Sequence, residues 1–177
     1  MSAAQHRAQA PEAPVACAVV TVSDTRTEET DASGALLKAR LREAGHRLAF
    51  TRIVQDDPEE IRAVLLHLAG DVEAVVTTGG TGIAGRDRTV EVAERLIRTP
   101  LPGFGELFRM LSYGEVGAAA MMSRATAGLY GPEDGAADTL LFCCPGSENA
   151  VALAADRLIL PELRHAAWEV RRQRRSA

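Results

Sequence analysis

The chain has 177 residues, 46% of them hydrophobic, a length that suits one α/β domain or two small ones. Its formal net charge of -4 argues against a general nucleic-acid binder, whose domain is usually strongly basic. The three cysteines, Cys17, Cys143 and Cys144, fit neither a disulfide framework nor a zinc site. Since all three lie in apolar runs, we expect buried thiols in a cytoplasmic protein.

The two ends of the chain differ in composition from the rest. Residues 1–14 are polar and rich in Ala and Pro, without the apolar segment of a signal peptide, and no stretch is apolar enough to span a membrane. We predict a disordered leader over 1–14, a single domain over 15–170 and a frayed basic tail over 171–177. The sequence therefore indicates neither a membrane nor a nucleic acid as partner.

The first half of the chain alternates between strand and helix patterns. Residues 16–23 form an apolar, Val-rich run typical of a strand buried on both faces. Ser33 is the expected N-cap of a helix that closes at Gly45. Residues 47–54 alternate only in part, which predicts a strand nearer the sheet edge. Asp57, followed by one Pro and two Glu residues, predicts the next helix start.

The second half repeats this alternation. Residues 73–78 predict a third strand, and a helical stretch follows over about 105–127. Residues 139–144 predict a further strand, with Ser147 as the cap of the next helix, and separate helical faces precede and follow Pro161. Strands that alternate with amphipathic helices predict an α/β fold, a three-layer α/β/α sandwich around a mostly parallel sheet.

The segment TTGGTGIAGRD, residues 77–87, contains the spacing G-x-G-x-x-G at Gly80, Gly82 and Gly85. A dinucleotide-binding fingerprint needs its third glycine in the first turn of a helix. Here three charged residues follow, and the next credible helix cap is Thr89. We therefore interpret the segment as a loop for another phosphate ligand, at the carboxyl end of a buried strand.

The side chains of this loop suit a phosphate ligand. Glycines let backbone N–H groups approach anionic oxygens, Thr78 and Thr81 add hydroxyls, and Arg86 can bind a phosphate with two N–H groups. Asp87 would repel such a ligand by about 3 kcal/mol at about 5 Å and an effective dielectric of about 20. A bridging Mg²⁺ would remove that repulsion. Alternatively, Asp87 caps a turn and pairs with Arg86, and the sequence leaves both interpretations open.

Five blocks occur in the order VTVSDTRTEETDASG, TTGGTGIAGRDRTVE, LPGFGELFRMLSYGEVG, MMSRATAG and CCPGSENAV. Together they resemble the molybdopterin adenylyltransferase family, which comprises molybdenum cofactor biosynthesis protein B and its Mog relatives. The resemblance extends from about residue 15 to residue 163. The third and fourth blocks are closer to the protein B branch than to Mog.

The resemblance implies a molybdopterin-binding-like fold that assembles as a homotrimer or a hexamer. It also implies an enzyme that uses Mg-ATP to adenylylate molybdopterin and releases pyrophosphate. The two essential acids of the family match Asp56 and Asp87, which would hold Mg²⁺, although Asp57 leaves a one-residue slip open. Because some protein B relatives lack the Arg-Asp-x-Thr signature, a non-catalytic molybdopterin-binding scaffold is the alternative. A molybdenum-insertion protein is a candidate partner.

The expected substrate-binding positions lie at strand ends and in the later family blocks. They are Ser23, Asp24, Thr78, Gly79, Gly80, Thr81, Gly82, Arg86, Thr89, Ser123, Arg124, Pro145, Gly146 and Ser147. Two of them have a purely structural alternative, since Ser147 could act only as a helix cap and Arg124 only in a surface ion pair. The apolar segments FRMLSY and AAAMMS indicate an interface between copies of the chain, or else they only fill the core.

Overall fold

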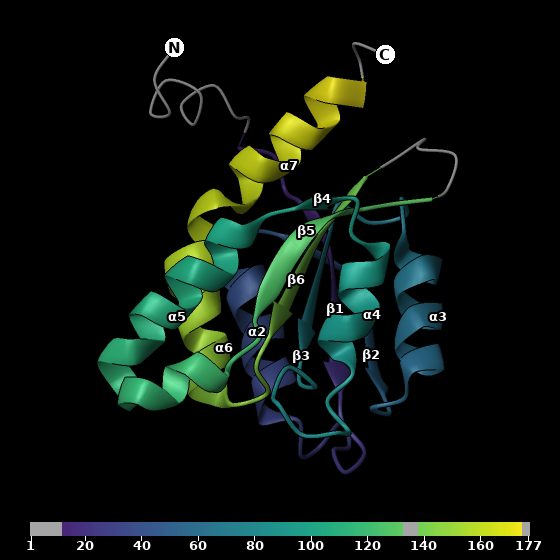
Figure 1. The fold of residues 1–177 in the computed structure, drawn as a ribbon. Coiled ribbons are helices and arrows are strands. Elements are labelled where there is room, and N and C mark those ends of the chain that lie inside the picture. The colour runs from purple at the N-terminus through teal and green to yellow at the C-terminus, as the bar shows by residue number, and fades with distance from the viewer. Residues whose placement is uncertain (1–11, 133–137, 175–177) are drawn as a thin grey trace.

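The computed structural model describes residues 12–132 and 138–174, with side chains up to residue 172, and contains one six-stranded sheet (Figure 1). The strands follow the spatial order β2-β1-β3-β6-β5-β4. Most of the leader predicted over 1–14 lies outside the described residues. Helices cover both faces of the sheet, which confirms the predicted α/β/α sandwich.

The first four strands in spatial order are parallel. Their bounds are β2 Arg47–Val54, β1 Ala16–Val22, β3 Ala74–Thr78 and β6 Thr139–Cys144. β1, β3 and β6 are buried along their whole length. β2, at the edge, mixes exposed and half-buried residues and ends in the buried Val54, as its partial alternation predicted. Because parallel strands point the same way, the loops that follow them meet at one edge of the sheet.

The other two strands were missed by the sequence prediction. β5 Thr126–Tyr130 pairs antiparallel with β6, and β4 Thr99–Pro100 pairs antiparallel with β5. The helical stretch predicted over about 105–127 is therefore wrong at both ends. Helix α5 spans Pro102–Val116 and a 3-10 helix, η1, spans Gly117–Met122.

The change from α5 to η1 has a local cause. Gly117 follows α5 as its C-cap and adopts a φ of +61°, a left-handed conformation that glycine adopts without strain. The chain then continues as the 3-10 helix η1 and becomes extended at β5.

The helices divide into two layers. α3 Pro58–Leu68 and α4 Thr89–Leu96 cover one face of the sheet. The other face carries α2 Ala32–Glu43, α5, α6 Glu148–Ala154 and α7 Leu160–Arg174. Successive strand residues contribute to opposite cores, so Val19 packs into the α2, α5 and α6 layer and Val20 into the α3 and α4 layer.

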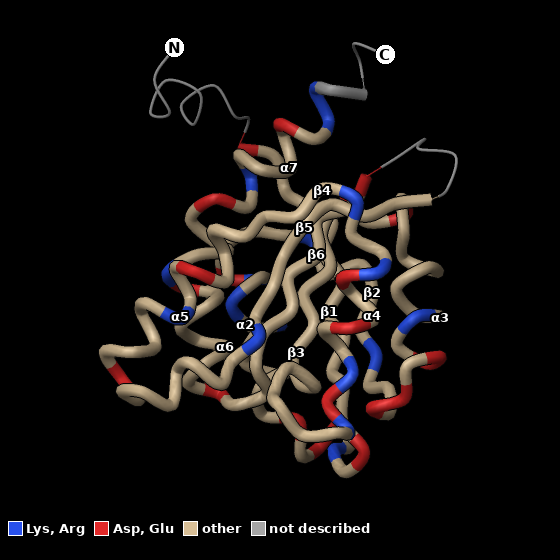
Figure 2. Tube along the Cα trace, in the orientation of Figure 1, with Lys and Arg blue, Asp and Glu red and all other residues tan. Residues whose placement is uncertain are grey.

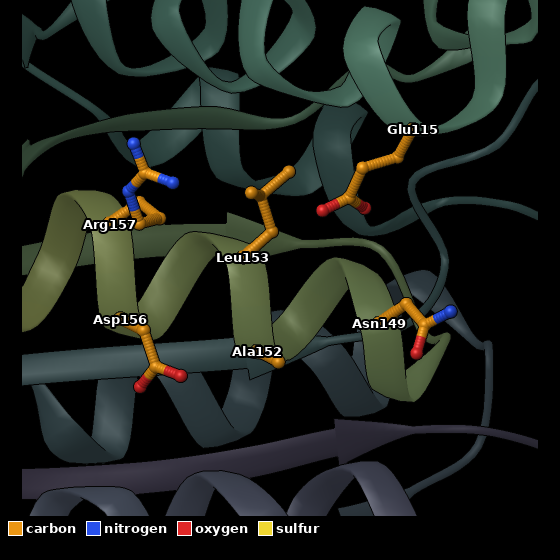
Figure 3. Close-up of a pocket in the computed structure, with 6 residues that line it drawn as sticks. All are labelled: Glu115, Asn149, Ala152, Leu153, Asp156 and Arg157. Atoms are coloured by element: carbon orange, nitrogen blue, oxygen red, sulfur yellow. The ribbon is translucent and has the colours of Figure 1, made fainter.

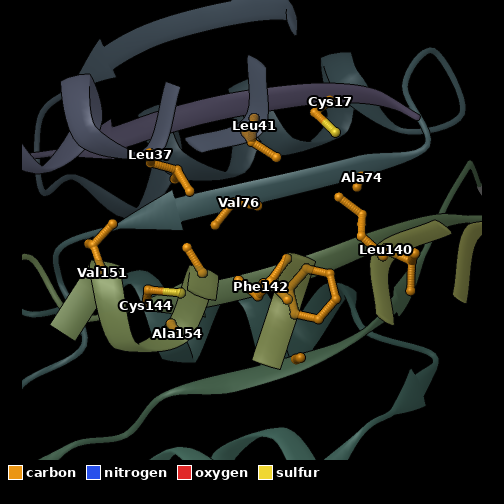
Figure 4. Close-up of a cluster of buried hydrophobic side chains, with 14 of the residues drawn as sticks. Cys17, Leu37, Leu41, Ala74, Val76, Leu140, Phe142, Cys144, Val151 and Ala154 are labelled. Carbon is orange, nitrogen blue, oxygen red and sulfur yellow. The ribbon is translucent and has the colours of Figure 1, made fainter. Parts of the chain in front are cut away.

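The larger core lies between the sheet and α2, α5, α6 and α7 (Figure 4). It is mainly aliphatic, and Phe104 meets Phe142 edge-on with 5.4 Å between ring centroids. The predicted burial of the thiols is confirmed, since Cys17, Cys143 and Cys144 are free and buried. Burial raises the pKa of the Cys17 thiol and that of Cys143 to about 12, so neither is a thiolate at neutral pH.

Two predicted helix starts have different outcomes. Asp57 caps α3 as expected, and its Oδ1 accepts from the backbone N–H groups of Glu59 at 2.9 Å and Glu60 at 3.0 Å. The Ser33 cap is wrong, because Asp31 occupies that position and accepts from the Gly34 N–H at 3.0 Å.

The polar groups around Asp31 explain this choice of cap. Its side chain is 2% exposed, the Thr21 hydroxyl donates to it at 2.6 Å, and Arg26 pairs with it at 3.3 Å. These partners come from β1 and from the loop after it, so no local pattern around Ser33 could have indicated them.

The cap predicted at Thr89 is also wrong. Arg88 holds the N-cap position of α4, and Thr89 is the first residue of the helix. The Thr89 hydroxyl donates to the carbonyl oxygen of Gly79 at 3.0 Å, so it ties the helix start to the glycine loop instead of capping the helix.

The last two predicted helices form one continuous helical run. α6 passes through a single π-helical segment, Ala155–Ile159, into α7, and Pro161 lies in the first turn of α7. The frayed tail predicted over 171–177 is wrong at its start, because α7 continues to Arg174 and Arg171 pairs with Glu73 of the 69–73 turn. Within the described ranges, no helix is both long and apolar enough to cross a membrane.

Candidate functional site

The loops after β1, β2 and β3 enclose a pocket of about 230 Å³ at the carboxyl edge of the sheet, which we call the aspartate pocket. Its lining comprises Val22, Ser23, Asp24, Thr25, Asp56, Gly80, Arg86 and Asp87. The structure therefore brings together the two expected metal-binding acids from loops that are 31 residues apart in sequence. Figure 2 shows acidic and basic positions alternating in the loops at this end of the molecule.

Asp56 is oriented by two backbone contacts. Its Oδ1 accepts from the Arg88 N–H at 3.1 Å, and its own N–H donates to the Asp24 carboxylate at 2.9 Å. The neighbouring Asp57 turns away to cap α3. Of the two adjacent acids, Asp56 is therefore the one that faces the pocket.

Asp87 belongs to a tight turn. Its Oδ2 accepts from the Ala84 N–H at 2.8 Å, and its N–H donates to the Ala84 carbonyl at 2.9 Å. The turn-capping role considered from the sequence is therefore real, and it is compatible with a ligand role. For both Asp56 and Asp87, the second carboxylate oxygen accepts no hydrogen bond from the described residues.

The surroundings of Asp56 in the pocket disfavour its ionised form. Burial raises the pKa of Asp56, the Arg88 N–H opposes that change, and the like charges of Asp87 and Asp24 raise the pKa further. Arg86 lowers it. Since crowded carboxylates disfavour ionisation of each other, a cation bound between them would be stabilised.

The glycine loop approaches β1 and Asp56 too closely for any side chain. Gly79 has a φ of +103°, and a Cβ there would lie 2.2 Å from the Val22 carbonyl oxygen. Gly80 has a φ of +64°, and its Cβ would lie 2.2 Å from the Thr89 Oγ1 and 3.1 Å from the Asp56 Oδ1. The glycines thus permit close packing at a strand end, and α4 begins only after the loop, unlike a dinucleotide fingerprint.

Glycines later in the loop differ from one another. A Cβ on Gly82 would lie 2.7 Å from the Asp87 Oδ2, so a side chain there would displace the carboxylate. A Cβ on Gly85 would meet nothing within 4 Å. Of these two glycines, only Gly82 is required by the packing around Asp87.

The threonines expected to contact substrate lie behind the pocket. Thr78 and Thr89 are 0% exposed and Thr81 is 3% exposed. The Thr78 hydroxyl donates to the Pro145 carbonyl at 3.2 Å, and that of Thr89 donates within the glycine loop. Their positions support the loops rather than line the pocket.

Arg124 is likewise engaged by the protein. Its guanidinium donates to the carbonyl oxygens of Gly82 at 2.8 Å and Asp87 at 3.0 Å, and it pairs with Glu91 at 2.5 Å. The ion pair considered from the sequence is therefore present, and it is partly buried. Sequence reasoning missed Glu91, because an acid in the first turn of a helix is common and indicates only a favourable helix dipole.

A second pocket, of about 220 Å³, contains the remaining expected positions except Gly146. We call it the serine pocket, and its lining comprises Phe108, Ser112, Glu115, Val116, Ala119, Ala120, Ser123, Pro145, Ser147, Asn149 and Ala150. Ser147 also caps α6, since its Oγ accepts from the Ala150 N–H at 3.3 Å. This pocket is largely apolar, in contrast to the aspartate pocket.

The two pockets are neighbours through the turn at Gly146. A Cβ on Gly146 would lie 3.3 Å from the Gly79 Cα, so this turn packs on the glycine loop. Arg26 fastens the same turn to the first loop, because its Nη2 donates to the Gly146 carbonyl at 2.7 Å. No motif in the sequence indicated this role of Arg26.

A third pocket, of about 540 Å³, contains none of the expected site residues. Its lining comprises Glu115, Asn149, Ala152, Leu153, Asp156 and Arg157. In Figure 3, Glu115 of α5 faces Leu153 and Arg157 across the space, whereas Asp156 points away. Glu115 and Asn149 also line the serine pocket, so the two cavities adjoin.

The fold and the site define a class of protein: an α/β domain whose candidate ligand pocket lies at the carboxyl ends of parallel strands, next to a glycine-rich loop and two acids. Residues 18–165 match the sequence profile of the family described as "Probable molybdopterin binding domain".

Similarity to individual proteins is more specific. The chain is 49% identical to molybdenum cofactor biosynthesis protein B of Bacillus cereus over 176 residues, covering 98% of this chain and 100% of that protein. A crystal structure of molybdenum cofactor biosynthesis protein B matches with a TM-score of 0.84 and 48% identity, over 92% of this chain and 99% of the other. The tungsten cofactor synthesizing protein MoaB from Pyrococcus furiosus matches with a TM-score of 0.80 and 36% identity, over 89% and 98%. The chain therefore belongs to the molybdenum cofactor biosynthesis protein B family.

Proposed function

We propose that the protein acts in molybdenum cofactor biosynthesis as a molybdopterin adenylyltransferase. The terminal phosphate of molybdopterin would attack the α-phosphorus of ATP, the bond to the β-phosphate would break, and pyrophosphate would leave. The observation that carries this proposal is that Asp56 and Asp87 line one pocket. Each has one carboxylate oxygen that accepts no hydrogen bond from the described residues. Membership of the family supports the pathway.

The donor set of the aspartate pocket fits Mg²⁺. This ion prefers oxygen ligands and is commonly held by one or two carboxylates together with substrate phosphates. In residues 12–132 and 138–172, no three His, Cys, Asp or Glu side chains form a metal-binding group, so phosphate oxygens would complete the coordination. Asp56 and Asp87 would hold the ion, which supplies charge neutralisation between carboxylates and phosphates.

The other residues of the pocket would position the reactants. Both substrates are polyanions, so the reaction depends on alignment and charge compensation more than on an acid or a base. The exposed Arg86 would bind a phosphate, and the backbone at Gly80 would approach its oxygens closely. The apolar serine pocket, whose lining includes Ser123 and Ser147, would receive the pterin.

A non-catalytic molybdopterin-binding protein of the same pathway is the second candidate. It is favoured by the similarity of the chain to molybdenum cofactor biosynthesis protein B, the branch in which some relatives lack the Arg-Asp-x-Thr signature. A pyrophosphate assay with molybdopterin and Mg-ATP separates the two candidates. We expect the wild type to release one pyrophosphate for each adenylyl-molybdopterin. Pterin binding without pyrophosphate above background would contradict the enzyme and favour the scaffold.

We further propose that the protein assembles as a homotrimer or a hexamer. Exposed apolar side chains follow one another at three-residue intervals along α5, and more lie on η1. They are Leu107, Met110, Tyr113, Val116, Met121 and Met122, each between 47% and 79% exposed. Large apolar side chains exposed in this number are typical of an interface. Light scattering should give a trimer or a multiple of it, and a monomer at micromolar concentration would contradict this proposal.

Two expectations about the cellular context also stay proposals. We propose a cytoplasmic location, which agrees with three free and buried thiols. A molybdenum-insertion protein is the proposed recipient of the product, because adenylyl-molybdopterin is the form ready for metal insertion in the family that the sequence resembles.

A further inference from the structure

The loop between β3 and α4, residues 81–88, is held at its base by one residue from a distant part of the chain. Arg124 lies between η1 and β5, and its backbone N–H donates to the Thr81 carbonyl at 3.1 Å. Its Nε donates to the Gly82 carbonyl at 2.8 Å, and its Nη2 to the Asp87 carbonyl at 3.0 Å. Arg124 therefore connects the outgoing and the returning limb of the loop.

The tip of this loop receives little support from packing. Ile83 is 70% exposed, Ala84 and Arg86 are exposed, and a methyl group on Gly85 would touch nothing. Burial therefore does not fix the tip, and the position of the Asp87 carboxylate depends on hydrogen bonds.

Glu91, in the first turn of α4, completes the arrangement. Its Oε1 accepts from the Arg124 Nη1 at 2.5 Å, and this bond keeps the pKa of Glu91 below its ordinary value. Its Oε2 is buried without a hydrogen-bond partner among the described residues. Only the planar guanidinium presents N–H groups to the two loop carbonyls and Glu91 at once, whereas a lysine supplies a single ammonium.

We propose that Arg124 and Glu91 are positioning residues, which hold the Asp87 carboxylate in place without touching the substrate. Arg124 lines neither the aspartate pocket nor the serine pocket. The catalytic consequence rests on the proposed function, because it concerns the metal-bound nucleotide. The effect on the loop itself is independent of any substrate.

The experiment compares Glu91→Gln and Arg124→Lys with Glu94→Gln, an exposed acid on the same helix. Amide hydrogen exchange, read by mass spectrometry on peptides spanning 81–88, reports the loop, and calorimetry reports ATP binding with and without Mg²⁺. Since each variant weakens a charge-assisted hydrogen bond, we expect loop exchange about tenfold faster and Mg-ATP binding about tenfold weaker. ATP binding without Mg²⁺ should match the control, and the melting temperature should fall by only a few degrees.

Glu91→Gln keeps the shape of the side chain, so it tests the pair even if Arg124→Lys fails to fold. Loop exchange at the wild-type rate in Glu91→Gln would overturn the proposal. So would acceleration spread over β1 and β3, which would indicate a role in the whole fold, or faster loop exchange with unchanged Mg-ATP affinity. If the wild type itself binds no Mg-ATP, the proposed function fails, and the exchange result alone decides whether the pair holds the loop.

Discussion

The two ends of the central sheet differ in how their charged groups are paired. At the amino ends of β1 and β3, Glu73 accepts from the Ala16 N–H at 2.8 Å and pairs with Arg171 of α7. Nearby, the His46 Nδ1 accepts from the Val15 N–H at 3.2 Å. Each of these polar groups has a complementary protein partner, so this end contributes to stability.

At the carboxyl ends of β1, β2 and β3, acids face one another. Asp24, Asp56 and Asp87 line one pocket, and burial together with the like charges raises the pKa of Asp56. A protein selected only for stability would not gather acids in this way. The free carboxylate oxygens at this end are therefore available for a ligand, whereas the crowding of the acids costs some stability.

The largest expected effect comes from the acids of the pocket. Asp87→Asn and Asp56→Asn should each lower turnover about a hundredfold or more, because the amide no longer offers a charge to the metal. Neither variant should lower the melting temperature, since each removes a like charge from the pocket. The pyrophosphate assay and thermal unfolding measure both quantities, with the exposed Asp71→Asn as the control. Wild-type turnover in Asp87→Asn would remove that residue from the mechanism.

The opposite result is expected at the other end of the sheet. Glu73→Ala removes the acceptor of the Ala16 N–H and the partner of Arg171, and it should lower the free energy of unfolding by about 1–3 kcal/mol. Turnover below the melting transition should equal that of the wild type. Urea unfolding provides the measurement, with the exposed Glu94→Ala for comparison. A loss of turnover without a loss of stability would contradict a purely stabilising role for this end of the sheet.

The pH dependence of activity tests the crowding of the acids at the carboxyl end of the sheet. Under the proposed function, the ionised form of Asp56 would hold the metal. Because the pKa of Asp56 is raised, activity should fall with decreasing pH at a higher pH than for an ordinary Asp. Asp24→Asn removes one of the like charges, which lowers the pKa of Asp56 and should move this acid limb to lower pH. A kcat/KM profile from about pH 4 to about pH 8 tests it. An unchanged limb, or one moved to higher pH, would contradict the assignment.

The smallest effect concerns His46. Burial and the Arg164 charge lower its pKa below the ordinary 6.5, so the neutral ring is favoured in the folded protein. Its contribution to stability is present above pH 6.5 and is lost as the pH falls through the lowered pKa. The drop in melting temperature from neutral to acid pH should therefore be smaller for His46→Gln than for the wild type. His67→Gln, on the exposed side of α3, is the matched control.

Much of the parallel part of the fold could be predicted, because its signals are local. The Val-rich run of β1 and the Asp-Pro-Glu-Glu start of α3 each indicate one element without reference to the rest of the chain. β5 could not be predicted, since Thr126–Tyr130 is short, contains Gly128, and follows a long helix. Its strand conformation depends on pairing with β6, a contact that no local pattern reveals.

The site could be predicted in part for the same reason. Parallel strands indicated that Asp56 and Asp87 would meet, and the helix cap at Asp57 separated the two adjacent acids. The supporting residues could not be found, because Arg26 and Glu91 act across distances of 120 and 33 residues in sequence. Motif spacing identifies residues that share a loop, and it does not report partners that fold onto the loop from elsewhere.

The most direct test of the proposed metal site is a calorimetric titration of the wild type, Asp56→Asn and Asp87→Asn with ATP, in the presence and absence of Mg²⁺. We predict that Mg²⁺ strengthens ATP binding to the wild type and that either substitution removes this gain, leaving metal-free affinity intact. Equal affinity of the wild type for ATP with and without Mg²⁺, or a gain retained in both variants, would contradict a metal-bridged nucleotide between these two acids.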